Sequence, residues 1–555
     1  MTAAEAEAKL SGPGGPFELI RTEVGGRPAQ VFKQRAPNLP ELLRRSLRFG
    51  DAELFVFDDG RRFSFRDHCR RVASTAEALA RRHGIGPGDR VAILGANAPE
   101  WIVGLWGTLC LGGIAVAMNG WWTRDEIRYG LDLTGPKLLL ADRRRLARFE
   151  GEDPGLPVVE FEDGFEDLWN AHSEAELPEV EIGEDDPAAI LFTRGPTGRP
   201  KGAVSTHRNL IAFLDITAYS AARTALLHGL KLEDDDRPQL VTLASSPLFH
   251  VSGLQSAALA NVYSGSKSVW TTGRFDPEKI LRLTLEEGIN RWGGVTTHIW
   301  RLLEHPDFEK YDLSRLLSVG GGGSTWSPEL QRLVRAKLPA ASRAMTVGYG
   351  LTECGGLATI ATDEILREHP DSVGRALPTV EVSIRDDDWR ELPEGGEGNV
   401  CIRGSMVMPG YWNNPEATAE AVSPDGWLKS GDIGWMRDGL LFLASRKRDL
   451  ILRGGENIYP VEIENRLEEH PGVAEAAVLG VEHRELGQEV KAVVVPRPGV
   501  RLDPQQVRDF VGETLAYYKV PRYVELRPEP LPRNASGKVL KNVLSGEAEN
   551  TFIEE

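Results

Sequence analysis

The stretch LFTRGPTGRPKG, residues 191–202, holds three glycines and two prolines within ten residues. This density of glycine and proline excludes a helix or a central strand. An apolar run, residues 188–192, precedes it, and a short β-like run, residues 203–205, follows it. The pattern therefore predicts a glycine-rich loop between two strands.

The chemistry of this loop fits an anion site. Consecutive N–H groups in a glycine-rich loop form a concavity that holds anions. Lys201 adds a cation, and Thr193 and Thr197 add hydroxyl donors. Considered by itself, the loop could equally well be an ordinary hairpin turn. The rest of the chain has to distinguish an anion-binding loop from such a turn.

Size and composition narrow the class of protein. A chain of 555 residues is too long for one core, so several subdomains are expected. Its apolar content of 41% and charged content of 26% are typical of globular proteins. A formal net charge of −17 argues against a nucleic-acid partner. The four cysteines lie far apart without a Cys-x-x-Cys pair, which predicts neither zinc nor disulfides: Cys69, Cys110, Cys354 and Cys401.

No membrane span or signal peptide is predicted. Residues 1–10 lack the apolar core of a signal peptide. Residues 101–123 carry no charge and are long enough to cross a bilayer, but several glycines interrupt them. We interpret this region as a buried helix (98–111), a glycine turn and a buried strand (114–118). A cytoplasmic protein is expected.

Helices and buried strands alternate up to Ala141 and again after the loop, which indicates a parallel α/β layer. Residues 1–30 are expected to be loosely ordered and then extended. Beyond Arg446, short strands and amphipathic helices describe a compact α+β domain of about 110 residues. We therefore predict a large domain, residues 1–445, and a small one, residues 446–555. Expected elements include helices at 66–83, 208–230, 254–263 and 277–287, and strands at 91–94, 240–244, 268–270 and 316–319.

Two further glycine-rich segments follow expected strands. Residues 320–323 are four glycines between the strand 316–319 and a helix near Ser327. They form either a flexible turn or a close approach to a flat ligand. In the second segment, glycines flank Tyr349, which lets its ring lie against a ligand, and Thr352 and Glu353 supply a hydroxyl and a carboxylate at one point.

Five more motifs follow the glycine-rich loop in order: GYGLTE (348–353), KSGD (429–432), SRKRD (445–449), GGENI (454–458) and PRNASGK (532–538). In this order and spacing they resemble the ANL superfamily of acyl-CoA synthetases, adenylation domains and beetle luciferases. The resemblance covers nearly the whole chain. It implies an α/β fold whose large N-terminal domain contains α/β subdomains and a small β-barrel-like region, followed by a small mobile α+β domain.

The resemblance assigns the adenosine end of a ligand. Tyr349 would stack on adenine, and Asp432 with Arg446 would hold the ribose hydroxyls. Without the resemblance, Asp432 is a turn residue and Arg446 a surface ion pair. The edge of the adenine would be lined by Gly322, Gly323, Ser324 and Gly350.

The phosphate end is assigned in the same way. Thr352 would bind the α-phosphate, and Glu353 would hold Mg²⁺, since a hard cation prefers carboxylate oxygen. Lys538 would reach the carboxylate and the α-phosphate as charge develops; alone, it is a solvated lysine. The polyphosphate would be held by Thr193, Arg194, Gly195, Thr197, Gly198 and Lys201.

The acyl and thiol ends follow from the segment 246–250 and the C-terminal motifs. His250 would be the gate between the acyl pocket and the thiol tunnel, although a lone histidine is more often structural. Two adjacent glycines, Gly293 and Gly294, leave space for a bulky acid. Arg448 would be the hinge about which the small domain rotates. The acyl pocket would include Phe249, His250, Gly253, Gly294 and Val295, and CoA would contact Lys447, Gly454, Gly455 and Lys519, with plain surface charge as the alternative for the lysines.

The loop departs from the family pattern, Thr-Ser-Gly-Thr-Thr-Gly-x-Pro-Lys-Gly, at two positions. Arg194 stands at the serine, and Pro196 stands at the first threonine of the Thr-Thr pair and lacks a backbone N–H. Both changes remove donors expected to bind the polyphosphate of ATP. Hydrogen bonds to charged groups contribute about 1.5–3 kcal/mol each, so losing two would slow adenylation about 10²–10⁴-fold.

The sequence therefore predicts an acyl-CoA ligase that mainly converts a preformed acyl-adenylate into a CoA thioester, with a separate adenylating enzyme as partner. It resembles the non-adenylating acyl-CoA ligases of platensimycin and platencin biosynthesis, which implies a bulky diterpenoid acid. The ligands would be the AMP moiety of the acyl-adenylate and CoA, with ATP and Mg²⁺ if adenylation is retained. Three alternatives stay open: a complete two-step synthetase, a non-catalytic adenylate-binding relative and a luciferase-like oxidase.

Overall fold

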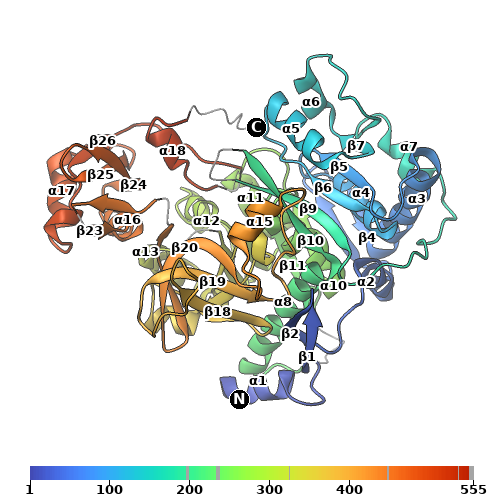
Figure 1. Ribbon diagram of the computed structural model, residues 1–555, viewed down its shortest axis with the longest axis horizontal. Coiled ribbons are helices and arrows are strands. Elements are labelled where there is room, and N and C mark those ends of the chain that lie inside the picture. Colours follow the sequence, from blue (N-terminus) through green and yellow to red (C-terminus); the bar gives the residue numbers. More distant parts are fainter. Residues whose placement is uncertain are drawn as a thin grey trace.

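A computed structural model describes the chain except for residues 195–198, 233–237, 324–325, 447–448, 455, 536 and 549–555. Its described strands form four sheets, two of which make up the body of the N-terminal part (Figure 1). A smaller sheet follows at the C-terminal end of the chain. The predicted α/β fold, with a large N-terminal domain and a small C-terminal one, is confirmed.

The first α/β sheet has the strand order β10-β9-β6-β5-β7-β8. Its strands run parallel except β10, which turns back antiparallel to β9. Every residue of β6 and β7 is buried, because α4 packs directly on the sheet and α3 packs on α4. The elements are α3 (Phe65–His83), β5 (Arg90–Leu94), α4 (Pro99–Cys110), β6 (Ile114–Ala117), α5 (Arg124–Thr134), β7 (Leu138–Ala141), α6 (Arg143–Leu146), β8 (Val158–Glu160), α7 (Phe165–Asn170), β9 (Pro187–Arg194) and β10 (Pro200–Thr206).

The uncharged stretch 101–123 contains α4, a turn and β6, as predicted, and all of α4 is buried. Within the described part of the chain, one helix is long and apolar enough to cross a membrane: α8 (His207–Leu227). Half of its most apolar window is buried, and it packs against β10 and the first helix of the chain. These are the contacts of a core helix.

The second sheet has 13 strands in the described part of the chain, in the order β18-β19-β20-β21-β17-β16-β15-β14-β13-β11-β12-β3-β4. Its central strands from β15 to β3 are parallel, and the strands from β16 to β18 are antiparallel. The first half contains β3 (Glu53–Phe57), β4 (Arg62–Ser64), β11 (Val241–Ala244), β12 (Lys267–Trp270), α11 (Pro277–Glu286), β13 (Arg291–Gly294), α12 (Thr296–Leu303), β14 (Ser318–Gly322), α13 (Pro328–Lys337) and β15 (Thr346–Tyr349). The second half contains β16 (Thr359–Thr362), α14 (Asp363–Glu368), β17 (Ser372–Ala376), β18 (Val380–Arg385), β19 (Gly398–Gly404), α15 (Pro415–Ala421), β20 (Leu428–Arg437) and β21 (Leu440–Arg446).

Strand β14 corrects one prediction. The sequence placed the end of the strand at Val319, but β14 continues through Gly322. A side chain on Gly321 would collide with the carbonyl of Gly294, and one on Gly322 would lie 2.7 Å from the carbonyl of Gly348. Glycine is therefore what lets this strand pass between β13 and β15.

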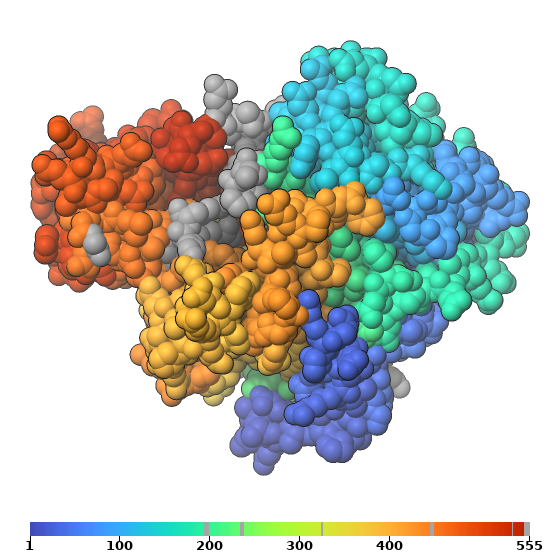
Figure 2. Space-filling view, in the orientation of Figure 1, coloured from blue at the N-terminus to red at the C-terminus, as the bar shows by residue number. Residues whose placement is uncertain are grey.

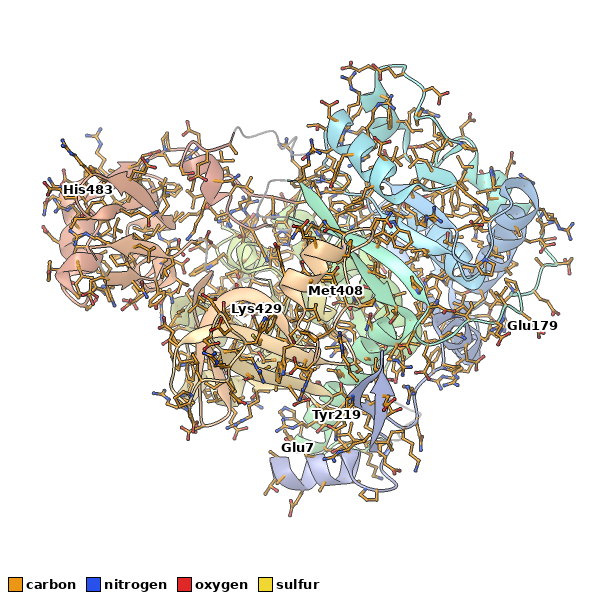
Figure 3. The ribbon with its side chains drawn as sticks, viewed as in Figure 1. Glu7, Glu179, Tyr219, Met408, Lys429 and His483 are labelled. Atoms are coloured by element: carbon orange, nitrogen blue, oxygen red, sulfur yellow. The ribbon has the colours of Figure 1, made fainter. Side chains whose placement is uncertain are left out.

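At the N-terminus the structure differs from a second prediction. Residues predicted to be loosely ordered form α1 (Ala3–Ser11), because Thr2 and Glu5 make a capping box. Ala6 and Leu10 are buried, and Glu7 pairs with Arg223 of α8 at 2.9 Å. Figure 3 labels Glu7 beside Tyr219, which also belongs to α8. The extended part follows as predicted, as β1 (Leu19–Val24) and β2 (Arg27–Phe32). The helix α2 (Leu39–Ser46) comes after it.

The helix predicted at 254–263 is not uniform. It consists of α9 (Val251–Gly253), a π-helical segment (Leu254–Leu259) and α10 (Ala260–Ser264). π-Helical turns are frequent at functional sites. This one begins four residues after the predicted gate residue, His250, with α9 between them.

The C-terminal sheet has the order β23-β22-β25-β24, with β26 on β25. In Figure 2 it belongs to the orange-to-red lobe at the left. An ion pair of 2.6 Å joins Arg497 in this lobe to Glu304 in the N-terminal part. A boundary at Arg446 and a hinge at Arg448 stay predictions, since Arg448 lies outside the described residues. The elements are β22 (Ile451–Arg453), β23 (Glu456–Ile458), α16 (Pro460–Glu468), β24 (Val473–His483), β25 (Gly487–Pro496), α17 (Pro504–Gly512), β26 (Tyr523–Leu526) and α18 (Lys541–Leu544).

Candidate active site

The base of the glycine-rich loop is the antiparallel pair β9–β10, in which Thr193 lies opposite Lys201. The two flanking strands predicted from the sequence are therefore present. The positions predicted to hold polyphosphate at the tip, Gly195, Thr197 and Gly198, lie outside the described residues, as do Pro196 and the side chain of Arg194. What can be placed is the base of the loop and its neighbours.

Glu353 lies next to this base. It belongs to the short 3₁₀ segment Thr352–Cys354 that follows β15, and it is 9% exposed. Its Oε1 accepts a hydrogen bond of 2.9 Å from the hydroxyl of Tyr411. Gly350 is needed at the turn before it, since a Cβ there would lie 2.5 Å from the carbonyl of Gly356.

Tyr411 was not predicted from the sequence. Its hydroxyl lies within hydrogen-bonding reach of Thr193 as well as of Glu353, and the ammonium of Lys201 lies 5.0 Å from its ring centroid. The only local signal was an aromatic residue after Gly410, shortly before the helix α15. Nothing in that pattern indicates partners that lie 58 and more residues away along the chain.

A second tyrosine–carboxylate contact lies at the predicted adenosine end. The hydroxyl of Tyr349, at the end of β15, donates to Oδ2 of Asp432 on β20 at 2.7 Å. Burial, and after it the charge of Asp432, raises the pKa of Tyr349 well above its ordinary value. Asp432 lies opposite Arg446 in the β20–β21 ladder, although the side chain of Arg446 is outside the described residues, as is Ser324. The structure thus places Tyr349 against Asp432, at the point where β20 pairs with Arg446 of β21.

Lys538 comes from the C-terminal lobe to the same region. A Cβ on Gly323 would lie 3.6 Å from Cε of this lysine, and Gly323 itself follows β14 with a left-handed φ of 82°. The loop before Lys538 rests on the N-terminal part, because a Cβ on Gly537 would lie 2.7 Å from Val295. The backbone N–H of Lys538 donates to Asn534 at 2.9 Å, which fixes the loop.

His250 lies within the influence of Lys538. Burial, and to a lesser degree the charge of Lys538, lowers the pKa of His250 to about 4, so the ring is neutral at pH 7. Its Nε2 is buried without a partner among the described residues. The ring centroid lies 4.8 Å from that of Phe249, which is buried. A neutral imidazole nitrogen without a partner among the described residues can contact a ligand.

The glycines predicted to line the acyl pocket have different surroundings. A side chain on Gly253 would collide with the carbonyl of Pro247, so this glycine lets α9 pack on its own loop. Gly293 has open space where a side chain would be, and at Gly294 the nearest atoms belong to His298, 3.7 Å away. His298, which the sequence did not single out, stacks on Phe275 at 3.8 Å between ring centroids.

The predicted CoA contacts lie apart from these residues. Lys519 forms an ion pair of 2.7 Å with Glu462, and the N–H of Gly454 donates to Leu486 at 2.8 Å. Both contacts are internal to the C-terminal lobe. Lys447 and Gly455 lie outside the described residues. In this orientation the lobe presents Lys538 to the site, and Lys519 and Gly454 do not contact Tyr349, Glu353 or His250 in the described part of the chain.

Comparisons with known proteins agree with this geometry. The model of the AMP-binding enzyme family matches residues 42–412, and that of the AMP-binding enzyme C-terminal domain matches residues 462–538. The chain is 33% identical to a 3-[(3aS,4S,7aS)-7a-methyl-1,5-dioxo-octahydro-1H-inden-4-yl]propanoyl:CoA ligase of Rhodococcus jostii (strain RHA1), over 92% of this chain and 98% of the relative. It is 32% identical to a feruloyl-CoA synthase of Amycolatopsis, over 90% and 96% of the two chains.

The chain is also similar to solved structures of related enzymes. ATP-bound MatB from Rhodopseudomonas palustris superposes with a TM-score of 0.79 at 30% identity, covering 92% of this chain and 99% of that one. The o-succinylbenzoate CoA synthetase MenE from Bacillus subtilis, in complex with its acyl-adenylate OSB-AMP, superposes with a TM-score of 0.77 at 28% identity, covering 92% and 98%.

Proposed function

Because the chain belongs to the AMP-binding enzyme family, we propose that it is an acid–thiol ligase that forms a CoA thioester of a carboxylic acid by way of an acyl-adenylate. The two curated relatives named above are a CoA ligase and a CoA synthase, and they are matched over most of their length. A solved relative holds an acyl-adenylate. These findings support the reaction class.

One observation carries the proposal. Residues from three segments far apart in the sequence, Tyr349 and Glu353, then Asp432, then Lys538, face one region of the structure. Asp432 can accept from ribose hydroxyls, and Lys538 can stabilise negative charge on the carboxylate and the α-phosphate. In the thioester-forming step, the sulfur of CoA forms a bond to the acyl carbon, the bond from that carbon to AMP breaks, and the thiol proton is released.

We further propose that this protein works mainly on a preformed acyl-adenylate. The support lies in the loop sequence: Arg194 replaces a serine, and Pro196 supplies neither a hydroxyl nor an N–H. Only adenylation needs donors for the outer phosphates of ATP. Two lost hydrogen bonds to a charged group correspond to a rate about 10²–10⁴-fold lower in that step. A separate adenylating enzyme would then supply the substrate.

The proposed acid is bulky and polycyclic, with a diterpenoid acid as the specific suggestion. Gly293 leaves open space in the region assigned to the acyl group. The Rhodococcus relative is named for a fused bicyclic propanoyl substrate, which supports an acid of this shape. The feruloyl-CoA synthase is named for a smaller aromatic acid, so a panel of acids has to include both kinds.

Mg²⁺ would be required if adenylation is retained. Among the described residues no three His, Cys, Asp or Glu side chains gather into a metal site, so Glu353 is the single protein ligand proposed. Proteins commonly hold Mg²⁺ through one or two carboxylates together with substrate phosphates. Glu353 fits this role, because its described partner is a neutral hydroxyl that leaves the negative charge in place. The bound ion would neutralise phosphate charge.

The competing function is a complete ATP-dependent synthetase, which the position of Lys538 beside Gly323 favours. Mass spectrometry of two parallel reactions separates the two: acid with ATP and CoA, and synthetic acyl-AMP with CoA. The proposal expects the thioester rapidly in the second reaction and slowly in the first. Comparable rates would overturn the restriction to thioesterification. Absence of thioester in both would indicate a non-catalytic adenylate-binding protein.

A reversion tests the loop itself. Arg194→Ser combined with Pro196→Thr restores the family residues, so pyrophosphate release from ATP and acid should rise by about 10²-fold or more. Thioester formation from acyl-AMP should stay unchanged in the same variant, which serves as the control. No gain in pyrophosphate release would show that these two positions are not the cause.

A further inference from the structure

Tyr411 is held rigidly at the base of the glycine-rich loop. Its neighbours on both sides pair with β10: the N–H of Trp412 donates to Gly202 at 2.7 Å, and the N–H of Val204 donates to Gly410 at 3.1 Å. Tyr411 itself forms a β-bridge with Ala203. The backbone of Tyr411 is therefore paired with the strand that carries Lys201.

The hydroxyl of Tyr411 makes one hydrogen bond and lies near a second polar group. It donates to Oε1 of Glu353 at 2.9 Å, and Thr193 lies within hydrogen-bonding reach of the same oxygen. A phenol carries one proton and two acceptor sites, so it can donate to the carboxylate while it accepts from the threonine. Burial, and after it Glu353, raises the pKa of Tyr411 far above its ordinary value, so the proton stays in place.

The contact also matters for Glu353. No described lysine, arginine or histidine lies within ion-pair distance of this buried carboxylate. A buried charge without donors is costly, and one charge-assisted hydrogen bond offsets part of that cost. Lys201 contacts the ring of Tyr411 at 5.0 Å from its centroid instead of pairing with Glu353. Tyr411 therefore touches three residues assigned above to the phosphate end of the ligand.

We propose that Tyr411 is a positioning residue that links Thr193, at the base of the glycine-rich loop, to Glu353, so that the loop base and the carboxylate proposed for Mg²⁺ are held as one unit beside the phosphate of the ligand. This inference rests on the proposed function and adds a residue to it. The link avoids the two altered positions, Arg194 and Pro196. It explains how the adenylate end of the site stays organised while the loop tip departs from the family pattern.

The test is Tyr411→Phe in the full-length protein, which removes the hydroxyl and keeps the ring beside Lys201. The first measurement is calorimetric binding of AMP with MgCl₂ present. We expect affinity about 10- to 100-fold lower, since one hydrogen bond to a charged group is lost. The matched control is Tyr517→Phe, whose ring is 84% exposed in the C-terminal lobe and should bind AMP as the wild type does.

A double-mutant cycle separates positioning from a merely structural role. Thr193→Val should weaken AMP binding, but the Tyr411→Phe/Thr193→Val protein should bind AMP no more weakly than Tyr411→Phe alone, because Thr193 acts through the tyrosine. Additive losses would overturn the link. Equal affinity of Tyr411→Phe and Tyr517→Phe would overturn it as well.

Turnover distinguishes this inference from the proposed function. With a synthetic decanoyl-AMP and a polycyclic acyl-AMP as probes, Tyr411→Phe should lower kcat for thioester formation while KM for CoA stays within about twofold of the wild type. If the wild type binds AMP but makes no thioester from any acyl-AMP, the proposed function fails while the binding cycle still decides the role of Tyr411. Thermal midpoints within a few degrees of the wild type verify that each variant is folded.

Discussion

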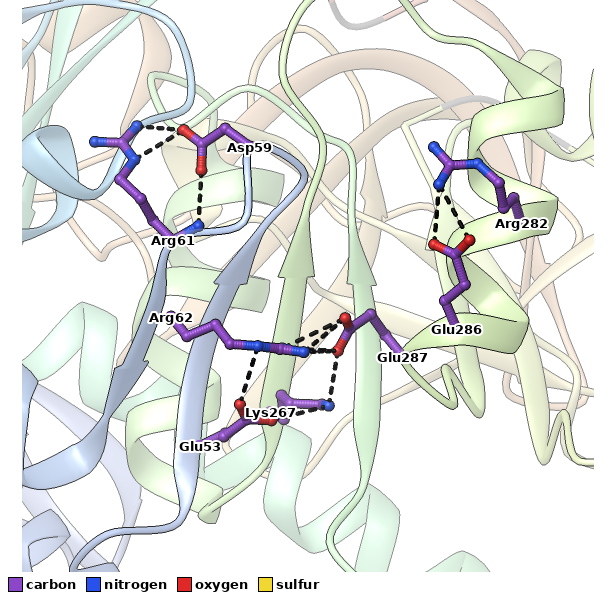
Figure 4. A network of polar contacts seen from close by, with 8 residues as sticks. All are labelled: Glu53, Asp59, Arg61, Arg62, Lys267, Arg282, Glu286 and Glu287. Carbon is purple, nitrogen blue, oxygen red and sulfur yellow. Dashed lines mark hydrogen bonds and ion pairs between the residues drawn. The ribbon is translucent and has the colours of Figure 1, made fainter.

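Two regions of the molecule hold carboxylates in different ways. At the edge of the long sheet, Glu287 accepts from Arg62 at 2.7 Å and from Lys267 at 3.2 Å, and Glu53 joins the same network (Figure 4). At the candidate active site, Glu353 and Asp432 each accept from a tyrosine hydroxyl. In one region cations neutralise the carboxylates, and in the other the hydroxyl of Tyr411 orients the carboxylate of Glu353.

The difference indicates what each region is for. An ion-pair network that closes on itself joins β3, β4, β12 and the end of α11, and it leaves no charge for a ligand. A hydroxyl that holds a carboxylate, as Tyr411 holds Glu353, leaves the negative charge at a fixed place, which suits a hard cation. Four predictions, from the largest expected effect to the smallest, test this contrast.

Asp432→Ala should give the largest effect. The variant removes an acceptor proposed for two ribose hydroxyls, so kcat/KM for acyl-AMP should fall about 10²–10⁴-fold, at about 1.5–3 kcal/mol for each hydrogen bond to a charged group. Steady-state kinetics measure the loss. Tyr349→Phe, which keeps the carboxylate, is the control and should lose far less. Near-normal kinetics in Asp432→Ala would remove this aspartate from the site.

Glu287→Gln should lower the stability of the protein and leave its activity unchanged. Arg62 and the largely buried Lys267 lose a charged partner, so the protein should be destabilised by about 1–3 kcal/mol, seen as a lower apparent midpoint in urea. Turnover of acyl-AMP by the folded variant should match the wild type. A loss of activity without a shift in the midpoint would contradict the division between the two regions.

Glu468, at the contact between the two lobes, has neither the cation pairing of Glu287 nor the tyrosine partner of Glu353 in the described part of the chain. Its carboxylate lies close enough to Ser327 of the N-terminal part for that hydroxyl to lower its pKa, but Oε2 is buried without a partner among the described residues. Burial raises the pKa of Glu468 from 4.5 to about 7; Glu464 and Glu329 also raise it, while Ser327 and Arg533 lower it.

A raised pKa means that the closed contact prefers the protonated acid. The contact should therefore be strongest below pH 4.5 and weaken as pH rises through about 7, by at most about tenfold per pH unit. Energy transfer between dyes on the two lobes measures the closed population. Glu468→Gln should flatten the pH profile between 4.5 and 7; an unchanged profile would assign the effect to other groups.

The smallest effect is expected at Arg282 and Glu286, which also appear in Figure 4. This pair, four residues apart on α11, has side chains 57% and 50% exposed. Exposed pairs of this kind contribute about 0.3–0.5 kcal/mol, so Glu286→Ala should shift the urea midpoint barely measurably. A shift as large as that of Glu287→Gln would show that cation pairing at this edge matters regardless of burial.

Much of the fold was predictable because the signals were local. The apolar runs at 91–94 and 114–118 became β5 and β6, and the 66–83 pattern became α3 with Gly84 as its left-handed cap. The predictions were wrong at two places. Gly320 to Gly322 were expected after a strand, yet they lie in β14, since neighbouring backbones occupy the side-chain space. The capping box at Thr2 and Glu5 was overlooked.

The candidate site was predicted only in part. Tyr349, Asp432, Glu353, Lys538 and His250 were singled out through motifs, and their roles stay predictions. Tyr411 and His298 were missed, because neither stands in a pattern that indicates a ligand. The loop tip that motivated the non-adenylating hypothesis lies outside the described residues, so that hypothesis depends on the chemistry of Arg194 and Pro196 and on the reversion experiment.

The sequence by itself determined the α/β alternation, the order of the motifs and the residue types at the loop, since these depend on periodicity and on the chemistry of single side chains. Only the tertiary structure decided which residues meet: Tyr349 with Asp432 across 83 residues, Tyr411 with Glu353 across 58, and Lys538 with Gly323 across two lobes. Such contacts follow from strand order and packing, which no local stretch encodes. The hydroxyl that holds Glu353 therefore became visible only in the folded chain.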